Sequence, residues 1–307
     1  MKNRKTSVNA SQWPLYLMLS APVMLVLVYS YIPMLGIVIA FQDFYPTSKG
    51  YVDSVLNAKF VGLDVYRYVF SLPDTKQVIF NTFFIAGMKI VAKLIFPVIF
   101  ALLINEVTTK WFKKAVQTIT FIPHFFSWVI VAGILLNIFS PRNGAVNIVL
   151  RALFNTELYF FGEPMLFPYM LTATDLWKNI GFNTIVILAA LTGIDPTLYE
   201  AAIVDGAGRI KQTVHITLPG IQSIVLLLAI LSLGNVLNAG FDQVYNLYSP
   251  AVYSTGDIID TYVYRTGLRS GQFSVATAVG LFKSAVSTIL IILSYWLANK
   301  FSDYRVF

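Results

Sequence analysis

The chain has 307 residues, of which 57% are apolar and only 12% are charged. Soluble domains carry about 25% charged residues, so this composition excludes an ordinary soluble protein and favours a membrane protein. The chain has no cysteine, which excludes disulfides, thiol catalysis and cysteine-ligated metal sites. Its formal net charge of +7 does not indicate nucleic-acid binding, because the basic residues are scattered among apolar runs.

Six apolar segments are each long enough to cross the hydrocarbon core as a helix, which takes about 20 residues. Backbone groups in lipid must bond internally, so such segments are helical. The first one is too long for a signal peptide and no cleavage site follows it, so we expect an uncleaved span. The sequence predicts an all-α polytopic membrane protein with spans at about Pro14–Ala40, Val78–Ile104, Gln117–Phe139, Met165–Thr192, Gly220–Asn238 and Gln272–Ala298.

The distribution of basic residues predicts the orientation of these spans. The segments on the same side as the N-terminus hold ten lysines and arginines, whereas the longer segments on the other side hold eight. Basic residues favour the cytoplasmic side, so both termini are expected inside. We therefore expect a cytoplasmic tail over 1–13, a six-span domain over 14–298 and a second cytoplasmic tail over 299–307.

The loop between the fourth and fifth spans, Gly193–Pro219, has the clearest local pattern. Asp195 suits a helix N-cap and Pro196 suits the first helical position. Gly206 stands where a helix ends with a left-handed residue. The pattern predicts a short helix, a sharp turn, and a second helical stretch over 209–216, after which Pro219 begins the fifth span.

The first of these short helices is too apolar for a free cytoplasmic helix, because it contains Leu198, Tyr199, Ile203 and Val204. Such an amphipathic element usually lies on a membrane or in a groove of a partner protein. The sequence favours a segment that inserts into another protein.

This loop resembles the EAA loop of ABC importer permeases. The family pattern is E-A-A, three residues, G, nine residues, I, one residue and L-P, and every spacing fits here, with Ile216 as the isoleucine. One departure is Ser223, where maltose-type permeases often have a further proline. The D-G-A form is similar to maltose-type carbohydrate permeases, and the external segments 241–247 and 258–265 resemble their polysaccharide and oligosaccharide branch. The resemblance assigns ATPase coupling to Glu200, Ala201, Ala202, Asp205, Gly206, Ala207, Leu218 and Pro219.

The resemblance implies a permease subunit that forms half of a translocation pathway for a sugar or oligosaccharide. In that family the EAA loop is a coupling helix that docks on a cytoplasmic ATPase, where its glutamate meets a basic group and its glycine allows the bend. An extracytoplasmic sugar-binding protein and a second permease, expected to be a different chain, complete the importer. The chain lacks the G-x-x-x-x-G-K-[ST] motif, so it is expected to be no enzyme and to need no cofactor of its own.

Polar residues inside spans are costly in lipid and mark transport pathways by default. In the fourth span Asp175, Lys178, Asn179 and Asn183 share one helical face, and Trp177 could stack on a sugar ring. These five residues are the candidate pathway. The alternatives are a structural Asp175–Lys178 pair, or asparagines that only join helices.

Two lysines of the second span, Lys89 and Lys93, are one turn apart, and snorkelling or contact with the partner permease is the expected role. Lys283 has no assigned role. His124 and His215 are far apart in the sequence, so no metal site is expected.

Two other functions compete with the permease. An ion-coupled secondary transporter would show inverted repeats and several intramembrane acids, whereas Asp175 is the one acid clearly within a span. A membrane-embedded enzyme would need a cluster of histidine and acidic residues near the membrane surface, and the sequence contains no such pattern.

Overall fold

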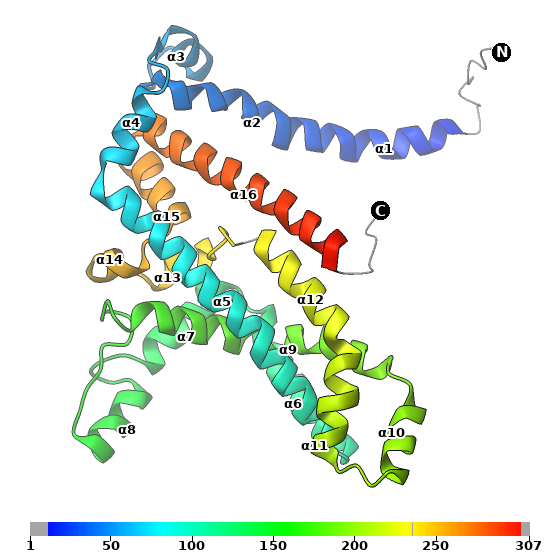
Figure 1. Cartoon of the computed structure of the whole chain (residues 1–307). Coiled ribbons are helices and arrows are strands. Elements are labelled where there is room, and N and C mark those ends of the chain that lie inside the picture. The colour runs from blue at the N-terminus through cyan, green and yellow to red at the C-terminus, as the bar shows by residue number, and fades with distance from the viewer. Residues whose placement is uncertain (1–11, 235, 302–307) are drawn as a thin grey trace, which may run out of the picture.

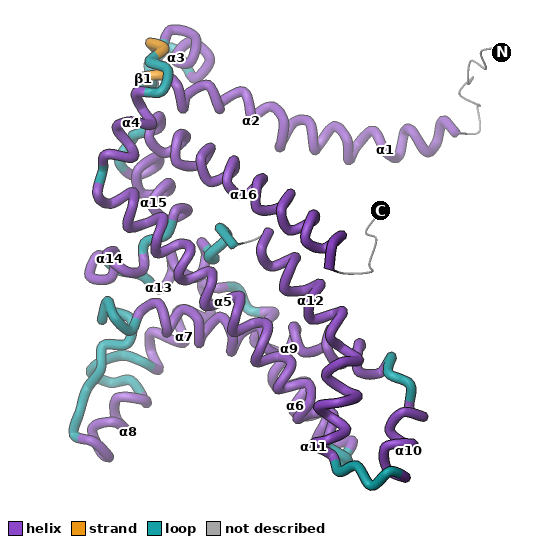
Figure 2. The backbone as a smooth tube through the Cα atoms, in the orientation of Figure 1, coloured by secondary structure: helices purple, strands orange, loops and turns teal. Residues whose placement is uncertain are grey.

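The computed structural model describes residues 12–234 and 236–301. Within these residues the regular secondary structure is helical apart from two short antiparallel strands, β1 (Gln42–Asp43) and β2 (Lys59–Phe60). Figure 2 shows the helices joined mostly by short loops. The all-α prediction is confirmed.

Four segments of the described chain are helical, long and apolar enough to cross a membrane: Trp13–Phe41, Pro73–Glu106, Arg209–Gly234 and Phe273–Leu297. Two bent helix pairs raise the number to six if each pair forms one span. These pairs are α6 (Lys110–Phe121) and η4 (Ile122–Phe125) with α7 (Trp128–Ile138), and α9 (Phe167–Thr192) with α10 (Pro196–Val204). Each of the six predicted spans overlaps one of these helices or bent pairs, and the fourth matches α9 alone.

The third predicted span, Gln117–Phe139, is bent in the middle. The chain bends by 108° between η4 and α7. Pro123 lies in the bend and has no N–H to continue the helix, and Ser127 restarts it by accepting a hydrogen bond from the Ile130 N–H. Half of this span is therefore α6, and the other half is α7.

The fifth span begins earlier than expected. Helix α11 (Arg209–Gln212), the π-helical turn η5 (Thr213–Thr217) and α12 (Leu218–Gly234) form one continuous helix, so Pro219 does not begin the span. Proline clashes with the carbonyl four residues before it. The wider π turn directly before α12 accommodates this clash.

The remaining helices form the first, second and sixth spans and the segments that connect the spans. The first span consists of α1 (Trp13–Val26), the π turn η2 (Leu27–Tyr31), α2 (Ile32–Met34) and the 3₁₀ segment η3 (Leu35–Phe41), while α5 (Pro73–Glu106) and α16 (Phe273–Phe301) are the second and sixth. The short connecting helices are α3 (Tyr51–Asn57), α4 (Asp64–Ser71), α8 (Ala145–Phe154), α13 (Phe241–Leu247), η6 (Pro250–Val252), α14 (Tyr253–Gly256), α15 (Ile259–Tyr264) and η7 (Arg265–Arg269).

Helix α5 is central to the bundle and packs along α9, while α12 packs along α16 (Figure 1). At the crossing of α6 and α9 the backbones touch, because a Cβ at Gly181 would lie 2.4 Å from the Thr120 carbonyl oxygen. Three buried apolar clusters stabilise the bundle, centred on Phe167 and Leu171, on Ile259 and Val279, and on Ile187 and Ile221.

The elements divide between two ends of the molecule. In Figure 1 the outer ends of α1 and α16 lie on the same side as α10 and α11, whereas α3, α8 and α14 lie on the opposite side. Helix α1 stands apart from the bundle and none of its residues is buried. The first span therefore meets the rest of the chain mainly through η3, which packs on α16.

Candidate functional site

The predicted coupling loop folds as the sequence indicates. The Asp195 Oδ1 accepts a hydrogen bond of 2.9 Å from the Thr197 N–H and so caps α10. This hydrogen bond lowers the pKa of Asp195 below its ordinary value. At the other end Gly206 has φ = +74°, a conformation that costs glycine no steric energy.

Two backbone hydrogen bonds close α10 around this glycine. The Ala207 N–H donates to the Ala202 carbonyl at 2.8 Å, and the Gly206 N–H donates to the Ile203 carbonyl at 3.0 Å. This pair of bonds defines a Schellman motif, in which the left-handed residue is usually glycine. The predicted left-handed turn at Gly206 is confirmed.

Three side-chain contacts hold the loop to the spans. The Tyr199 hydroxyl lies 3.0 Å from the Thr217 Oγ1, and the Arg209 guanidinium lies 3.0 Å from the Glu106 carboxylate at the end of α5. The Gln212 Nε2 donates to the Ala207 carbonyl across the turn. Between α5 and the loop these contacts border a cavity of about 480 Å³.

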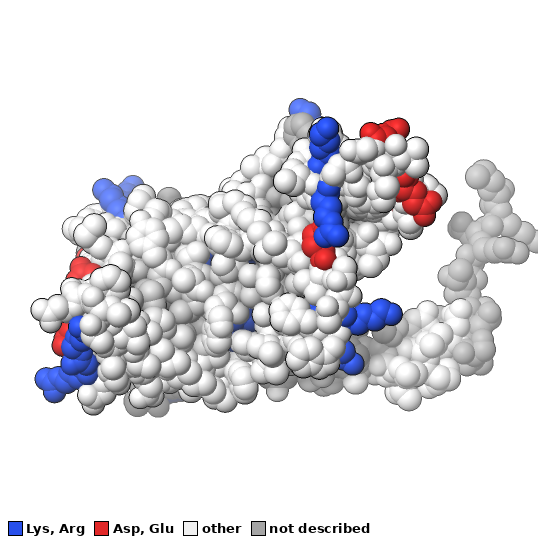
Figure 3. Space-filling model, turned by 90° about the horizontal axis from the view of Figure 1, so that it is seen from below, with Lys and Arg blue, Asp and Glu red and all other residues white. Residues whose placement is uncertain are grey.

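The outer surface of the loop exposes large apolar side chains. The side chains of Leu198, Ile203, Val204 and Ile210 are 51%, 64%, 87% and 81% exposed. Glu200 is also exposed. Contiguous exposed apolar groups rimmed by polar ones mark interaction surfaces. In Figure 3 charged side chains of both signs gather at the two ends of the molecule, and the surface between them shows few.

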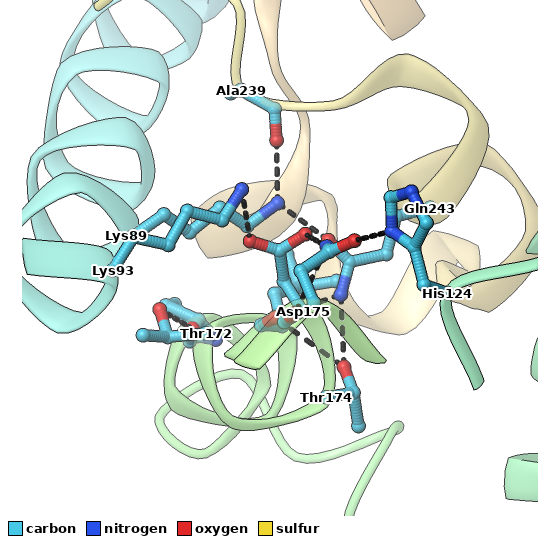
Figure 4. A network of polar contacts seen from close by, with 11 residues as sticks. Lys89, Lys93, His124, Thr172, Thr174, Asp175, Ala239 and Gln243 are labelled. Carbon is cyan, nitrogen blue, oxygen red and sulfur yellow. Dashed lines mark hydrogen bonds and ion pairs between the residues drawn. The ribbon is translucent and has the colours of Figure 1, made fainter. Parts of the chain in front are cut away.

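A polar network inside the bundle contains most of the candidate pathway residues (Figure 4). The Lys93 Nζ on α5 lies 2.7 Å from the Asp175 Oδ2 on α9. Asn179 donates to the Asp175 Oδ1 at 2.9 Å, and its own Oδ1 lies 2.9 Å from the His124 Nδ1. Asp175 thus pairs with Lys93 and not with Lys178.

The buried lysines of this network bind carbonyl groups at breaks in helices. The Lys89 Nζ donates to the Ala239 carbonyl at 2.6 Å and to the Gln243 Oε1. The Lys178 Nζ donates to the His124 carbonyl at 2.8 Å. The His124 carbonyl lies in the bend of the third span, and the Ala239 carbonyl lies in the loop that leads to α13. A buried carbonyl without a hydrogen bond is costly.

The expectation that Lys89 snorkels is therefore wrong. Its side chain points inward and is 6% exposed, because the Ala239 carbonyl, in the loop before α13, offers it a buried acceptor. Gln243, which sequence reasoning placed in an external loop, is 1% exposed and also donates to the Leu171 carbonyl and the Thr174 hydroxyl. No periodic signal in the sequence marked it, because α13 is only two turns long.

The other candidate residues lie apart from the network. Trp177 is on a different face of α9 and is 49% exposed. Asn183, together with Lys93 and Ser232, lines a cavity of about 120 Å³ between α5, α9 and α12. Sugar contact by Asp175, Trp177, Lys178, Asn179 and Asn183 stays a prediction.

Lys283 and the two histidines have local partners. The Lys283 Nζ lies 2.5 Å from the Asp260 carboxylate. The His124 ring stacks on Phe182 with centroids 4.3 Å apart, and the His215 Nδ1 lies 3.0 Å from the Lys211 carbonyl oxygen. The described residues contain no cluster of three potential metal ligands among histidine, cysteine and acidic side chains.

Comparison with known proteins identifies the family. The family described as "Binding-protein-dependent transport system inner membrane component" matches residues 93–303. Protein LplB of Bacillus subtilis (strain 168) is 39% identical over 98% of this chain and 93% of its own length. The polygalacturonan/rhamnogalacturonan transport system permease protein YteP of the same organism is 40% identical over 95% of this chain and 90% of its own.

A solved structure has the same fold. A chain of a bacterial ABC transporter involved in the import of the acidic polysaccharide alginate superposes with a TM-score of 0.86 at 35% identity, covering 95% of this chain and 97% of that one. A second structure of a bacterial alginate ABC transporter contains a pentasaccharide-bound periplasmic protein and matches equally well. With its EAA-type loop and helical spans, the chain belongs to the family of binding-protein-dependent inner-membrane transport components, as a multi-pass plasma-membrane permease subunit of a sugar or oligosaccharide ABC importer.

Proposed function

We propose that the loop Gly193–Pro219 is the surface on which the importer's cytoplasmic ATPase docks, with α10 as the coupling helix. The observation that carries this proposal is the exposed apolar surface of α10, which ends in a turn held by Gly206 and by the bond of Tyr199 to the fifth span. Exposed apolar side chains on a capped, side-chain-anchored helix suit insertion into a cleft of another protein.

Individual residues of α10 take distinct parts in this docking. The exposed Glu200 carboxylate is free to meet a basic group of the ATPase, in a charge-assisted contact of roughly 1.5–3 kcal/mol. Ala201 and Ala202 let a partner backbone approach closely. Asp205, Gly206 and Ala207 form the turn that ends the helix, and Leu218 and Pro219 begin α12.

The remaining assembly follows from the division of the molecule into two ends. The coupling loop and both chain termini are assigned to the cytoplasm, and the α3, α8 and α14 side to the extracytoplasmic sugar-binding protein. A second permease, a different chain, completes the pathway and offers the exposed first span a neighbour. ATP is hydrolysed by the partner ATPase, so the part of this chain is conformational, an alternating-access change driven from the loop.

The transported molecule that we propose is an oligosaccharide released from a polysaccharide. Support comes from YteP and from the alginate transporter, whose descriptions name polysaccharides. The small cavity beside Asn183 and Lys93 offers hydrogen-bonding groups of the kind that sugar hydroxyls need.

The test is capture of the ATPase by the assembled importer. Wild type is compared with Gly206→Val and Glu200→Lys, with Gly208→Ala as the matched control. Gly208 has φ = −69° and open space around it, so alanine fits there. Loss of capture in the first two variants and retention in the control support docking at this loop.

The opposite results are equally clear. Equal capture by all four proteins removes the coupling role from α10. If the wild-type assembly captures no ATPase and reconstituted transport runs on an ion gradient alone, the ion-coupled alternative replaces the ABC mechanism, and Asp175 becomes the residue to study.

A further inference from the structure

Helix α8 (Ala145–Phe154) lies on the side opposite the coupling loop and stands away from the bundle (Figure 1). It follows α7 after only six residues, 139–144, a segment that spans at most about 20 Å when fully extended. Helix α8 therefore stays close to the end of a membrane-spanning helix.

The attachment of α8 is rigid. The Asn147 side chain is fully buried and donates to the carbonyls of Ser140 and Leu158, which precede and follow the helix, at 3.0 Å each. Its Oδ1 accepts from the Leu158 N–H at 2.9 Å. A Cβ at Gly144 would lie 2.5 Å from the Ile138 carbonyl oxygen, so the chain passes tightly over the end of α7. These contacts prevent α8 from rolling to hide its other face.

That other face is apolar and exposed. Ile148, Val149 and Leu153 are 55%, 54% and 69% exposed, and the exposed Ala152 lies between them. Positions i, i+1, i+4 and i+5 share one side of a helix. The basic side chain of α8 is elsewhere, because Arg151 is held at the back by the Arg142 carbonyl and by Glu157.

We propose that α8 is an interfacial anchor, lying in the outer leaflet with Ile148, Val149 and Leu153 facing the acyl chains. Two features select lipid as the occupant. The helix that precedes it, α7, also exposes apolar side chains, Ile130, Ile134 and Ile138. Basic residues lie off this face, Arg142 in the turn before α8 and Arg151 at the back of the helix, which is the pattern of helices that lie in the membrane interface. The proposal does not depend on the ATPase docking at α10.

Spin labelling tests the occupant directly, because the chain has no cysteine of its own. Ile148→Cys and Leu153→Cys are labelled with a nitroxide in the complete importer, with cysteine-free partner subunits, in nanodiscs of anionic and zwitterionic lipid. Asn143→Cys, exposed in the turn before α8, is the matched control. Relaxation by oxygen, which partitions into acyl chains, is compared with relaxation by a water-soluble nickel chelate.

The anchor predicts that oxygen relaxes the labels at 148 and 153 more strongly than the nickel chelate, and that the order reverses at 143. Strong relaxation by nickel at 148 and 153 would show that the face lies in water and overturn the proposal. Weak relaxation by both reagents would show that a protein covers it, which also overturns the lipid assignment. The two positions test the same face, so failure of one variant to fold leaves the other as the test.

Discussion

The predicted coupling loop exposes its side chains, whereas the α5–α9 network buries them. In the loop Val204 is 87% exposed and Glu200 is exposed too, whereas in the network Asp175 and Lys178 are each 6% exposed and bonded. Apolar side chains are thus exposed in the loop, and charged side chains are buried in the bundle. The difference fits the docking role that we propose for the loop, and it indicates that the network joins helices within the bundle. Four substitutions test this comparison.

The largest effect is expected from Asp175→Ala. Removing one partner of a buried ion pair costs roughly 3–5 kcal/mol, and we expect about 3 because the Lys93 side chain is 38% exposed. Unfolding of the purified importer in detergent measures this loss. The double variant Lys93→Met, Asp175→Leu is expected to regain much of it, because no charge is then left unpaired.

A stable Asp175→Ala protein that no longer transports would reverse this interpretation. The carboxylate would then serve the pathway and not the fold.

Gly181→Ala is expected to destabilise the bundle by about 1–3 kcal/mol, the usual cost of an extra methyl group in a tight core. The new Cβ would meet backbone, the Thr120 carbonyl, which cannot move aside as a side chain would. Gly87→Ala in α5 is the matched control, since its Cβ meets nothing within 4 Å and alanine favours a helix by about 0.5–1 kcal/mol. Equal stability of the two variants would mean that α6 and α9 separate more easily than their contact suggests.

Tyr199→Phe is expected to weaken coupling and leave stability nearly unchanged. It removes one hydrogen bond, to Thr217, of about 1 kcal/mol. We expect less ATP hydrolysis stimulated by the loaded binding protein, at an unaltered unfolding temperature. A drop in stability without a change in stimulation would place Tyr199 with the interior network instead.

The smallest effect concerns the cap of α10. Because the Thr197 N–H lowers the pKa of Asp195, the cap is fully present above the ordinary aspartate pKa of about 3.9 and is lost as the pH falls below it. Amide hydrogen exchange in the first turn of α10 should therefore speed up under acid, beyond its intrinsic pH dependence. Asp195→Asn keeps an acceptor and removes the titration, so this extra change should vanish in it.

The sequence predicted the loop more accurately than the spans. The cap at Asp195 and the turn at Gly206 depend on residues within a few positions, so local chemistry determines them. The bend at Pro123 and the π turn before Pro219 are also local, yet the apolar runs conceal them, because lipid selects for hydrophobicity and not for straightness.

The polar network was beyond sequence reasoning for a different reason. Helical spacing placed Asp175, Lys178 and Asn179 on one face correctly, but their partners come from distant parts of the chain. Lys93 precedes Asp175 by 82 positions, and the carbonyl that Lys89 binds is 150 positions away. Only the packed bundle shows that these charges stabilise broken backbone.

The continuous helix from Arg209 to Gly234 has a mechanical consequence. Its 26 residues form one helical segment about 39 Å long. At one end Arg209 forms an ion pair with Glu106 of α5. The other end lies five residues before Ala239, whose carbonyl accepts a hydrogen bond from Lys89. Under the docking role that we propose for α10, a displacement at the Arg209 end would be carried to the far half of the bundle through one continuous helix, with the π turn η5 as the place where that helix can bend.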